Sequence, residues 1–135
     1  MQVAPYLNFK GNCAEAFRFY EKCFGGKIEM MMTHNDAPPD MQNNPAWKDM
    51  IMHVRLNLKG AIIMGSDAPG DYYKQPQGWH VSLTVDNGAD ADRIFKDLSE
   101  GGNITMPLQK TFWSEKFGMV NDRFGIPWMI NFEGR

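Results

Sequence analysis

Three histidines are the residues of this 135-residue chain that could act as general acids or bases near neutral pH. His80 opens the alternating stretch His80-Val81-Ser82-Leu83, where it could be a base or hydrogen-bond donor in a pocket, or hold a purely structural hydrogen bond. His53 lies in the middle of another alternating stretch, on a face that we expect to be solvated or dimer-facing, and His34 begins a polar loop. Because no His-x-His or His-x-x-x-His spacing occurs, the histidines alone do not predict a metal site.

The two cysteines, Cys13 and Cys23, are expected to be buried and unreactive. On one helix their separation would be about 15 Å at ~1.5 Å per residue, which is too long for a disulfide. Neither has a metal-binding spacing or a histidine nearby in the sequence. The glycine pairs Gly25-Gly26 and Gly101-Gly102 lack the surrounding pattern of a phosphate-binding loop.

Charge and hydropathy exclude several classes of partner. The net charge of −2 gives no electrostatic reason to expect nucleic acid or an anionic membrane. No apolar run approaches the ~20 residues of a membrane span, and no signal peptide is recognisable, so a cytoplasmic location is expected. The length fits a single domain, or a domain built from two halves.

Two helices and a series of short strands must position these residues. Asn12 and Asn87 are expected to cap the helices, Asn12 with Glu15 in a capping box, and the two glycine pairs are expected to end them. Alternating or apolar runs predict strands at residues 3–9, 27–33, 50–58, 61–64, 79–86 and 103–108. The segment 110–132 predicts a closing hairpin whose tight turn runs from Asp122 to Pro127.

The order of elements occurs twice, which indicates an α+β fold of two tandem βαβββ modules with a curved mixed sheet. Module 1 is expected at about residues 1–66 and module 2 at about 78–135, joined by a linker at 67–77. The loop at 34–49 is rich in proline and asparagine, and it is either the lid or wall of a pocket or a dispensable insertion. We expect the two sheets to combine around a shared concavity.

Several phrases resemble the PhnB-like branch of the vicinal oxygen chelate superfamily, which includes glyoxalase I, bleomycin-resistance proteins and extradiol dioxygenases. The phrases are Pro5-Tyr6-Leu7-Asn8-Phe9, Gly65-Ser66-Asp67, Thr111-Phe112-Trp113, Asp122-Arg123-Phe124-Gly125 and Pro127-Trp128-Met129-Ile130-Asn131. The resemblance spans nearly the whole chain and implies the glyoxalase/bleomycin-resistance fold. It also implies a homodimer, as does the need to protect open sheet edges.

Members of this superfamily usually hold a divalent metal through side chains from four strands. The resemblance places His80 at one ligand position, but it places Ala4 or Tyr6, Met64 and Met129 at the others. Alanine and methionine are not ligands for Mg²⁺, Mn²⁺ or Zn²⁺. No cofactor is therefore expected, although a divalent metal held in an unusual way is an alternative.

The implied pocket is apolar, aromatic and rich in methionine, as small-molecule sites often are. We expect it to be lined by six residues: Tyr6, Asn8, Met64, His80, Trp113 and Met129. The first hypothesis is a metal-independent small-molecule-binding protein; the alternatives are a glyoxalase- or lyase-type enzyme using His80, and a structural or regulatory protein with a vestigial pocket. Methyl transfer, a label given to some relatives, is not expected, because the chain lacks the nucleotide-binding glycines and the helices of a doubly wound sheet.

Overall fold

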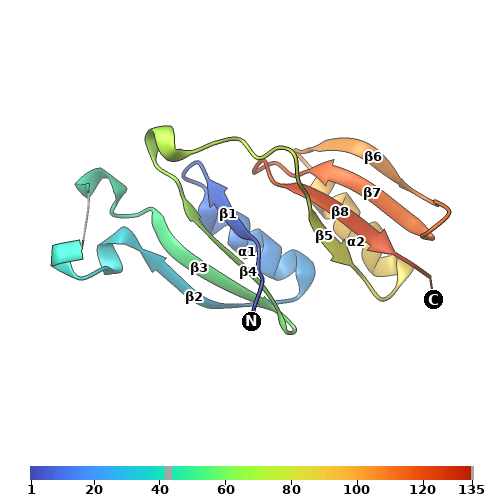
Figure 1. The fold of residues 1–135 in the computed structure, drawn as a ribbon, viewed down its shortest axis with the longest axis horizontal. Helices are drawn as coiled ribbons and strands as arrows, with labels where there is room; N and C mark the ends of the chain where they lie inside the picture. Colours follow the sequence, from blue (N-terminus) through green and yellow to red (C-terminus); the bar gives the residue numbers. More distant parts are fainter. Residues whose placement is uncertain (42–43, 135) are drawn as a thin grey trace. The chain divides into compact units, whose positions relative to one another are not determined.

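The computed structural model describes residues 1–41 and 44–134, and these residues divide into two compact units, Met1–Lys74 and Gln75–Arg135 (Figure 1). The division falls within the segment that the sequence assigns to a linker. Within the described residues, none of the helices is long and apolar enough to cross a bilayer.

The first unit contains one helix and a four-stranded mixed sheet (Figure 1). Its elements are β1 (Tyr6–Phe9), α1 (Cys13–Phe24), β2 (Lys27–Thr33), β3 (Ile51–Leu58) and β4 (Ala61–Asp67). The strand order is β1-β4-β3-β2, in which β1 runs parallel to β4 and the other pairs are antiparallel. Between β2 and β3 the chain forms short 3₁₀ turns, η1 (His34–Asp36), η2 (Pro39–Met41) and η3 (Pro45–Trp47), and η4 (Gly70–Tyr72) follows β4.

The second unit repeats this arrangement. Its elements are β5 (Val81–Thr84), α2 (Gly88–Ser99), β6 (Asn103–Gln109), β7 (Lys116–Asn121) and β8 (Pro127–Phe132). The order β5-β8-β7-β6, with β5 parallel to β8, matches the order of the first sheet strand for strand. The predicted α+β fold of two βαβββ modules is therefore confirmed, with one mixed sheet in each module.

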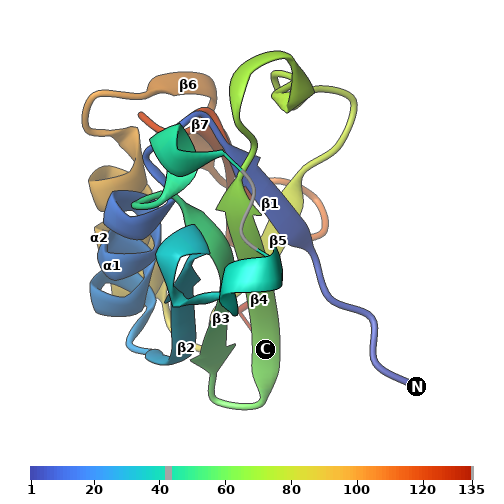
Figure 2. The ribbon, with the colours of Figure 1, turned by 90° about the vertical axis from the view of Figure 1, so that its left-hand side faces the viewer.

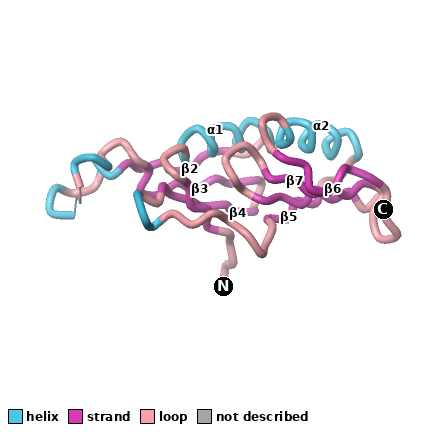
Figure 3. Tube along the Cα trace, turned by 90° about the horizontal axis from the view of Figure 1, so that it is seen from above, coloured by secondary structure: helices cyan, strands magenta, loops and turns pink. Residues whose placement is uncertain are grey.

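Each helix lies on one face of its own sheet (Figure 3). In both helices the buried side chains recur at helical spacing, and they include Ala16, Phe17 and Tyr20 in α1 and Ala91, Ile94, Phe95 and Leu98 in α2. Phe24, at the end of α1, is only partly buried. A strand glycine allows each close approach: a Cβ at Gly65 would lie 2.7 Å from the ring of Phe17, and a Cβ at Gly118 would lie 2.6 Å from the ring of Phe95. Within the described residues, neither α1 nor α2 covers the opposite face of its sheet (Figure 3).

Gly25 ends α1 as predicted, but the predicted N-terminal side-chain cap is found in one unit only. The Asn87 side chain accepts a hydrogen bond of 2.8 Å from the backbone N–H of Asp90, as predicted. The predicted capping box at Asn12 is wrong, because the Asn12 side chain makes no capping hydrogen bond. Instead Oδ1 of Asp67, at the end of β4, accepts from the backbone N–H groups of Gly11 and Cys13, both at 3.0 Å.

Several strand boundaries differ from the prediction: β1 begins at Tyr6 instead of residue 3 and β5 ends at Thr84 instead of residue 86. β4 continues to Asp67, because Ser66 and Asp67 pair with Asn8 and Phe9 of β1. β5 begins only at Val81, so His80 lies just before the strand instead of opening it.

The closing hairpin has the predicted tight turn, and the buried carboxylate of Asp122 holds it together. Oδ1 accepts from the backbone N–H groups of Phe124 at 2.9 Å and Ile126 at 3.0 Å, while Oδ2 accepts from Nε1 of Trp128 at 2.9 Å. The phrase from Asp122 to Trp128, among the most specific of the resemblance, therefore forms a structural turn.

Candidate functional site

Three of the six predicted pocket residues lie together on the open face of the first sheet, away from α1. Leu7 and Phe9 of β1 are buried toward the helix, whereas Tyr6 and Asn8 point to the other side and are exposed. Tyr6 is directly opposite Met64 in the neighbouring strand, and Asn8 is opposite Ser66. The open face therefore combines an aromatic ring and a thioether with polar side chains at one end.

Tyr6 is also held by His53 on the same face. Its hydroxyl lies 3.1 Å from Nδ1 of His53, and the two rings stack with centroids 5.7 Å apart. The expectation that His53 faces only solvent or a dimer partner missed this contact. Farther along the sheet, Glu29 accepts hydrogen bonds from Asn57 and Arg55, which hold the pKa of its carboxyl below the ordinary value.

The other three predicted residues belong to the second unit. Met129 lies opposite Ser82 and Met119 on the face of the sheet away from α2. The ring of Trp113 lies 5.4 Å from that of Phe117, and Trp113 is 45% exposed. His80 is exposed immediately before β5. The half-exposed Trp113 thus differs from Trp128, which is fully buried in the core.

The resemblance places Tyr6, Met64, His80 and Met129 at the positions of the superfamily's metal ligands. Within residues 1–41 and 44–134 there is no group of three or more histidine, cysteine, aspartate or glutamate side chains that could hold a metal ion. The sulfur of a methionine is a soft ligand and the hydroxyl of Tyr6 is hydrogen-bonded to His53, so this donor set does not fit a hard divalent cation.

The loop at 34–49 forms part of the wall of a pocket in the first unit, which favours the first of the two interpretations of this loop. The pocket measures about 480 Å³ and receives His34, Asn44 and Trp47 from the loop. Figure 2 views the first unit from the end where the turns of this loop leave the sheet. Sequence reasoning did not assign Trp47, Asp67 or Tyr72 to a site; the available signal was aromatic residues in otherwise polar, proline-rich segments.

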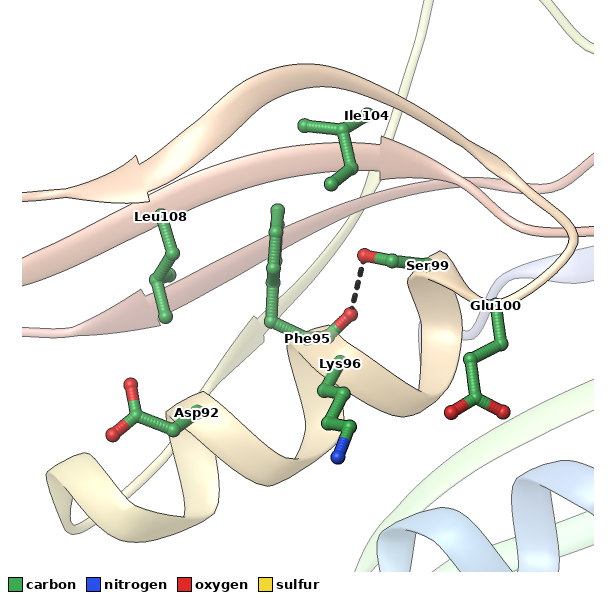
Figure 4. A pocket seen from close by; sticks show the side chains of 7 residues that line it. All are labelled: Asp92, Phe95, Lys96, Ser99, Glu100, Ile104 and Leu108. Atoms are coloured by element: carbon green, nitrogen blue, oxygen red, sulfur yellow. Dashed lines mark hydrogen bonds between the residues drawn. The ribbon is translucent and has the colours of Figure 1, made fainter.

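A second, shallower depression lies in the second unit between α2 and the edge strand β6 (Figure 4). Phe95 rises from the helix between Ile104 and Leu108, and the charged residues Asp92 and Lys96 lie along the helix. Its volume is about 380 Å³ and its lining is mainly apolar. None of its residues belongs to the predicted pocket.

The cysteines are buried and free, as predicted. Burial, together with the neighbouring carboxylate of Asp67, raises the pKa of the Cys13 thiol far above its ordinary value. A thiol in this state is not a nucleophile, because the reactive form is the thiolate.

Comparison with known proteins identifies relatives over almost the whole chain. The family model described as 3-demethylubiquinone-9 3-methyltransferase matches residues 1–131. Protein YjdN of Escherichia coli (strain K12) is 33% identical over 139 aligned positions, which cover 97% of this chain and 95% of YjdN.

Solved structures share the fold, and two of them are also similar in sequence. Protein PA1353 from Pseudomonas aeruginosa is 44% identical, with a TM-score of 0.88 and 98% of each chain covered. A PhnB protein from Bacillus cereus is 25% identical, with a TM-score of 0.77, covering 98% of this chain and 99% of the other. A glyoxalase-related enzyme from Fulvimarina pelagi, 16% identical with a TM-score of 0.60 over 98% of this chain and 88% of the other, shares the fold alone.

Proposed function

Because this chain belongs to the PhnB-like family, whose model is described as 3-demethylubiquinone-9 3-methyltransferase, and has the glyoxalase-like fold, we propose that it binds a small organic molecule on the open faces of its sheets. In the first unit the contacting residues are Tyr6, Asn8 and Met64, and in the second unit they are His80, Trp113 and Met129. Binding does not depend on a divalent metal.

The proposal rests on one observation: the open faces present aromatic and methionine side chains that are only partly buried. Tyr6 is 44% exposed and Trp113 is 45% exposed, whereas the helix-facing side chains of the same sheets form the core. Aromatic and thioether groups adapt to apolar ligands of varied shape, and the neighbouring Asn8 supplies a polar group that can orient them.

A binding role also explains why the usual chelating groups are missing from these positions. Met64 and Met129 offer apolar contact where a carboxylate would hold a metal. The activity in the family's description does not follow from the fold, because each unit is a mixed four-stranded sheet with a single helix. Methyltransferases of the common class bind their nucleotide-type cofactor on a doubly wound parallel sheet.

We also propose that the chain forms a homodimer. Each sheet ends in strands whose outer backbone groups have no partner strand within that sheet, β1 and β2 in one unit and β5 and β6 in the other. Pairing or covering such edges is a common reason for self-association. Sedimentation equilibrium gives the test: a monomer at every concentration contradicts this part of the proposal. The cytoplasmic location stays a prediction from the sequence.

Binding of the dye 1-anilinonaphthalene-8-sulfonate, followed by its fluorescence, tests the open-face site. Replacing Tyr6 or Met129 by alanine removes about 60 Å² of apolar contact, worth about 1.5 kcal/mol, so the dissociation constant should rise about tenfold. Ile104→Ala is a matched control, because Ile104 is an apolar residue of similar exposure, 47%, that lines the other depression.

If Ile104→Ala alone weakens binding, the dye occupies the depression beside α2 and the proposed site is wrong. The enzyme alternative requires turnover that His80→Ala abolishes while the fold stays intact. Saturable binding of S-adenosylmethionine would instead support methyl transfer and contradict the proposal.

A further inference from the structure

The pocket walled by the loop at 34–49 has a size and lining suited to a ligand of its own. Its volume of about 480 Å³ lies within the range of roughly 300–1,000 Å³ typical of small-molecule sites. It is formed entirely within the first unit, and none of the six residues proposed for the open faces lines it.

Asp67 is one of the residues that line the pocket, and it is only 6% exposed. Its oxygens accept three hydrogen bonds from neutral backbone N–H groups: those of Gly11 and Cys13 on Oδ1, and that of Ile51, at 2.9 Å, on Oδ2. Oδ2 thus accepts one of these bonds and retains capacity for a further donor. The ion pairs found in the described part of the chain do not include Asp67, so no cationic side chain neutralises the charge of this lining residue.

The segments around the pocket reinforce this negative charge. Residues 34–49 and 66–73 contain five aspartates, Asp36, Asp40, Asp49, Asp67 and Asp71, against the single lysine Lys48. Of the five aspartates only Asp67 lines the pocket; the others add negative potential around it, which attracts ligands of the opposite charge.

The remaining walls provide aromatic surface. Trp47 and Tyr72 both line the pocket, and Tyr72 is 77% exposed. The ring of His34 packs edge-on against Trp47 with centroids 6.0 Å apart, and its buried Nδ1 has no hydrogen-bond partner. An ammonium group carries several N–H donors, one of which can serve the remaining acceptor capacity of Asp67. Aromatic faces attract cations in addition to apolar groups.

We infer that this pocket binds a small organic cation, a protonated amine whose ammonium group lies beside Asp67 and whose apolar body lies against Trp47 and Tyr72. The site is separate from the proposed open-face site, and each can fail without the other.

An NMR titration of the whole protein with benzylamine tests this inference, with the indole N–H of Trp47 as the reporter. Benzyl alcohol has the same shape without the charge, and benzoate carries the opposite charge. We expect saturable shifts with benzylamine, affinity at least about tenfold lower for benzyl alcohol, since a charge-assisted contact is lost, and no binding of benzoate. The charge is varied on the ligand and Asp67 is left unchanged, because a substitution of Asp67 would also disturb the three backbone N–H groups that it accepts from.

The variants Trp47→Ala and Tyr72→Ala should each weaken benzylamine binding by about fivefold or more. Because Trp47→Ala removes the NMR reporter, its affinity is measured by calorimetry. The neighbouring Tyr73, whose ring lies beneath Lys10 and does not line the pocket, is the matched control, and Tyr73→Ala should leave the affinity within about twofold. Equal binding of benzylamine and benzyl alcohol overturns the inference. The inference is also overturned if Tyr6→Ala abolishes benzylamine binding while Trp47→Ala leaves it unchanged, because the amine would then bind on the open face.

Discussion

The carboxylate of Asp122 should be one of the largest single contributors to stability in the second unit. Asp122 is 5% exposed, and its two oxygens accept three hydrogen bonds of 2.9–3.0 Å from Phe124, Ile126 and Trp128. In Asp122→Ala all three donors lose this acceptor, in a turn that water reaches poorly. At ~1–3 kcal/mol for each unsatisfied buried donor, and allowing for groups that share one acceptor, the free energy of unfolding should fall by about 3–5 kcal/mol.

The variant Asp122→Asn separates the two parts of this interaction. It keeps an oxygen for the two backbone N–H groups but places an amide N–H₂ opposite Nε1 of Trp128, so the loss should be smaller, about 1–2 kcal/mol. In this background Trp128→Phe should cost less than in the wild type, because the indole N–H no longer has a partner to lose.

Urea unfolding followed by both circular dichroism and tryptophan fluorescence measures these differences, since two probes reveal whether the units unfold together. Asp86→Ala, which changes an exposed aspartate of the same unit, should shift stability by no more than about 0.5 kcal/mol. A loss below about 1 kcal/mol in Asp122→Ala would refute the view that this carboxylate holds the hairpin.

Three further outcomes follow from the geometry. Gly65→Ala should destabilise the first unit by more than about 2 kcal/mol in urea unfolding, because the new Cβ would meet the ring of Phe17 and a backbone oxygen, both at 2.7 Å. Cys13 should stay unreactive toward a disulfide reagent at pH 8 until the chain is unfolded; rapid labelling of the native protein would contradict its burial. Hydrogen bonds from the backbone and the side chain of Thr33 lower the pKa of Asp36 from its ordinary value of 3.8. These bonds therefore stabilise the η1 turn above pH 3.8, and the stabilisation is lost as the pH falls through the lowered pKa of Asp36. In an NMR titration Thr33→Val should raise the pKa of Asp36 partway toward 3.8.

The sequence predicts the elements well because their signals are local. The helical period identifies the buried face of α2 completely, and the alternation in β1 separates Leu7 and Phe9 from Tyr6 and Asn8. The repeated order of elements identifies the two modules, since a tandem repeat leaves its pattern along the whole chain.

What the sequence missed depends on contacts between distant residues. Asp67 caps the start of α1 from more than fifty positions away, so the local preference of Asn12 gave the wrong cap. The same long-range pairing extends β4 through Ser66, which is polar and resembles a linker residue. The contact of Tyr6 with His53 and the pocket around Trp47 likewise depend on which strands and loop ends meet in the fold. Composition does not predict such long-range contacts.

The methionines of the chain allow the central claim to be tested directly. In protein labelled with ¹³C at the methionine methyl groups, titration with 1-anilinonaphthalene-8-sulfonate should shift the signals of Met64 and Met129, which lie on the open faces. Met1 and Met41, both strongly exposed elsewhere, should not shift, and Zn²⁺ should move none of these signals. Shifts confined to other methionines, or a saturable response of Met64 and Met129 to Zn²⁺, would contradict a metal-independent binding site on the open faces.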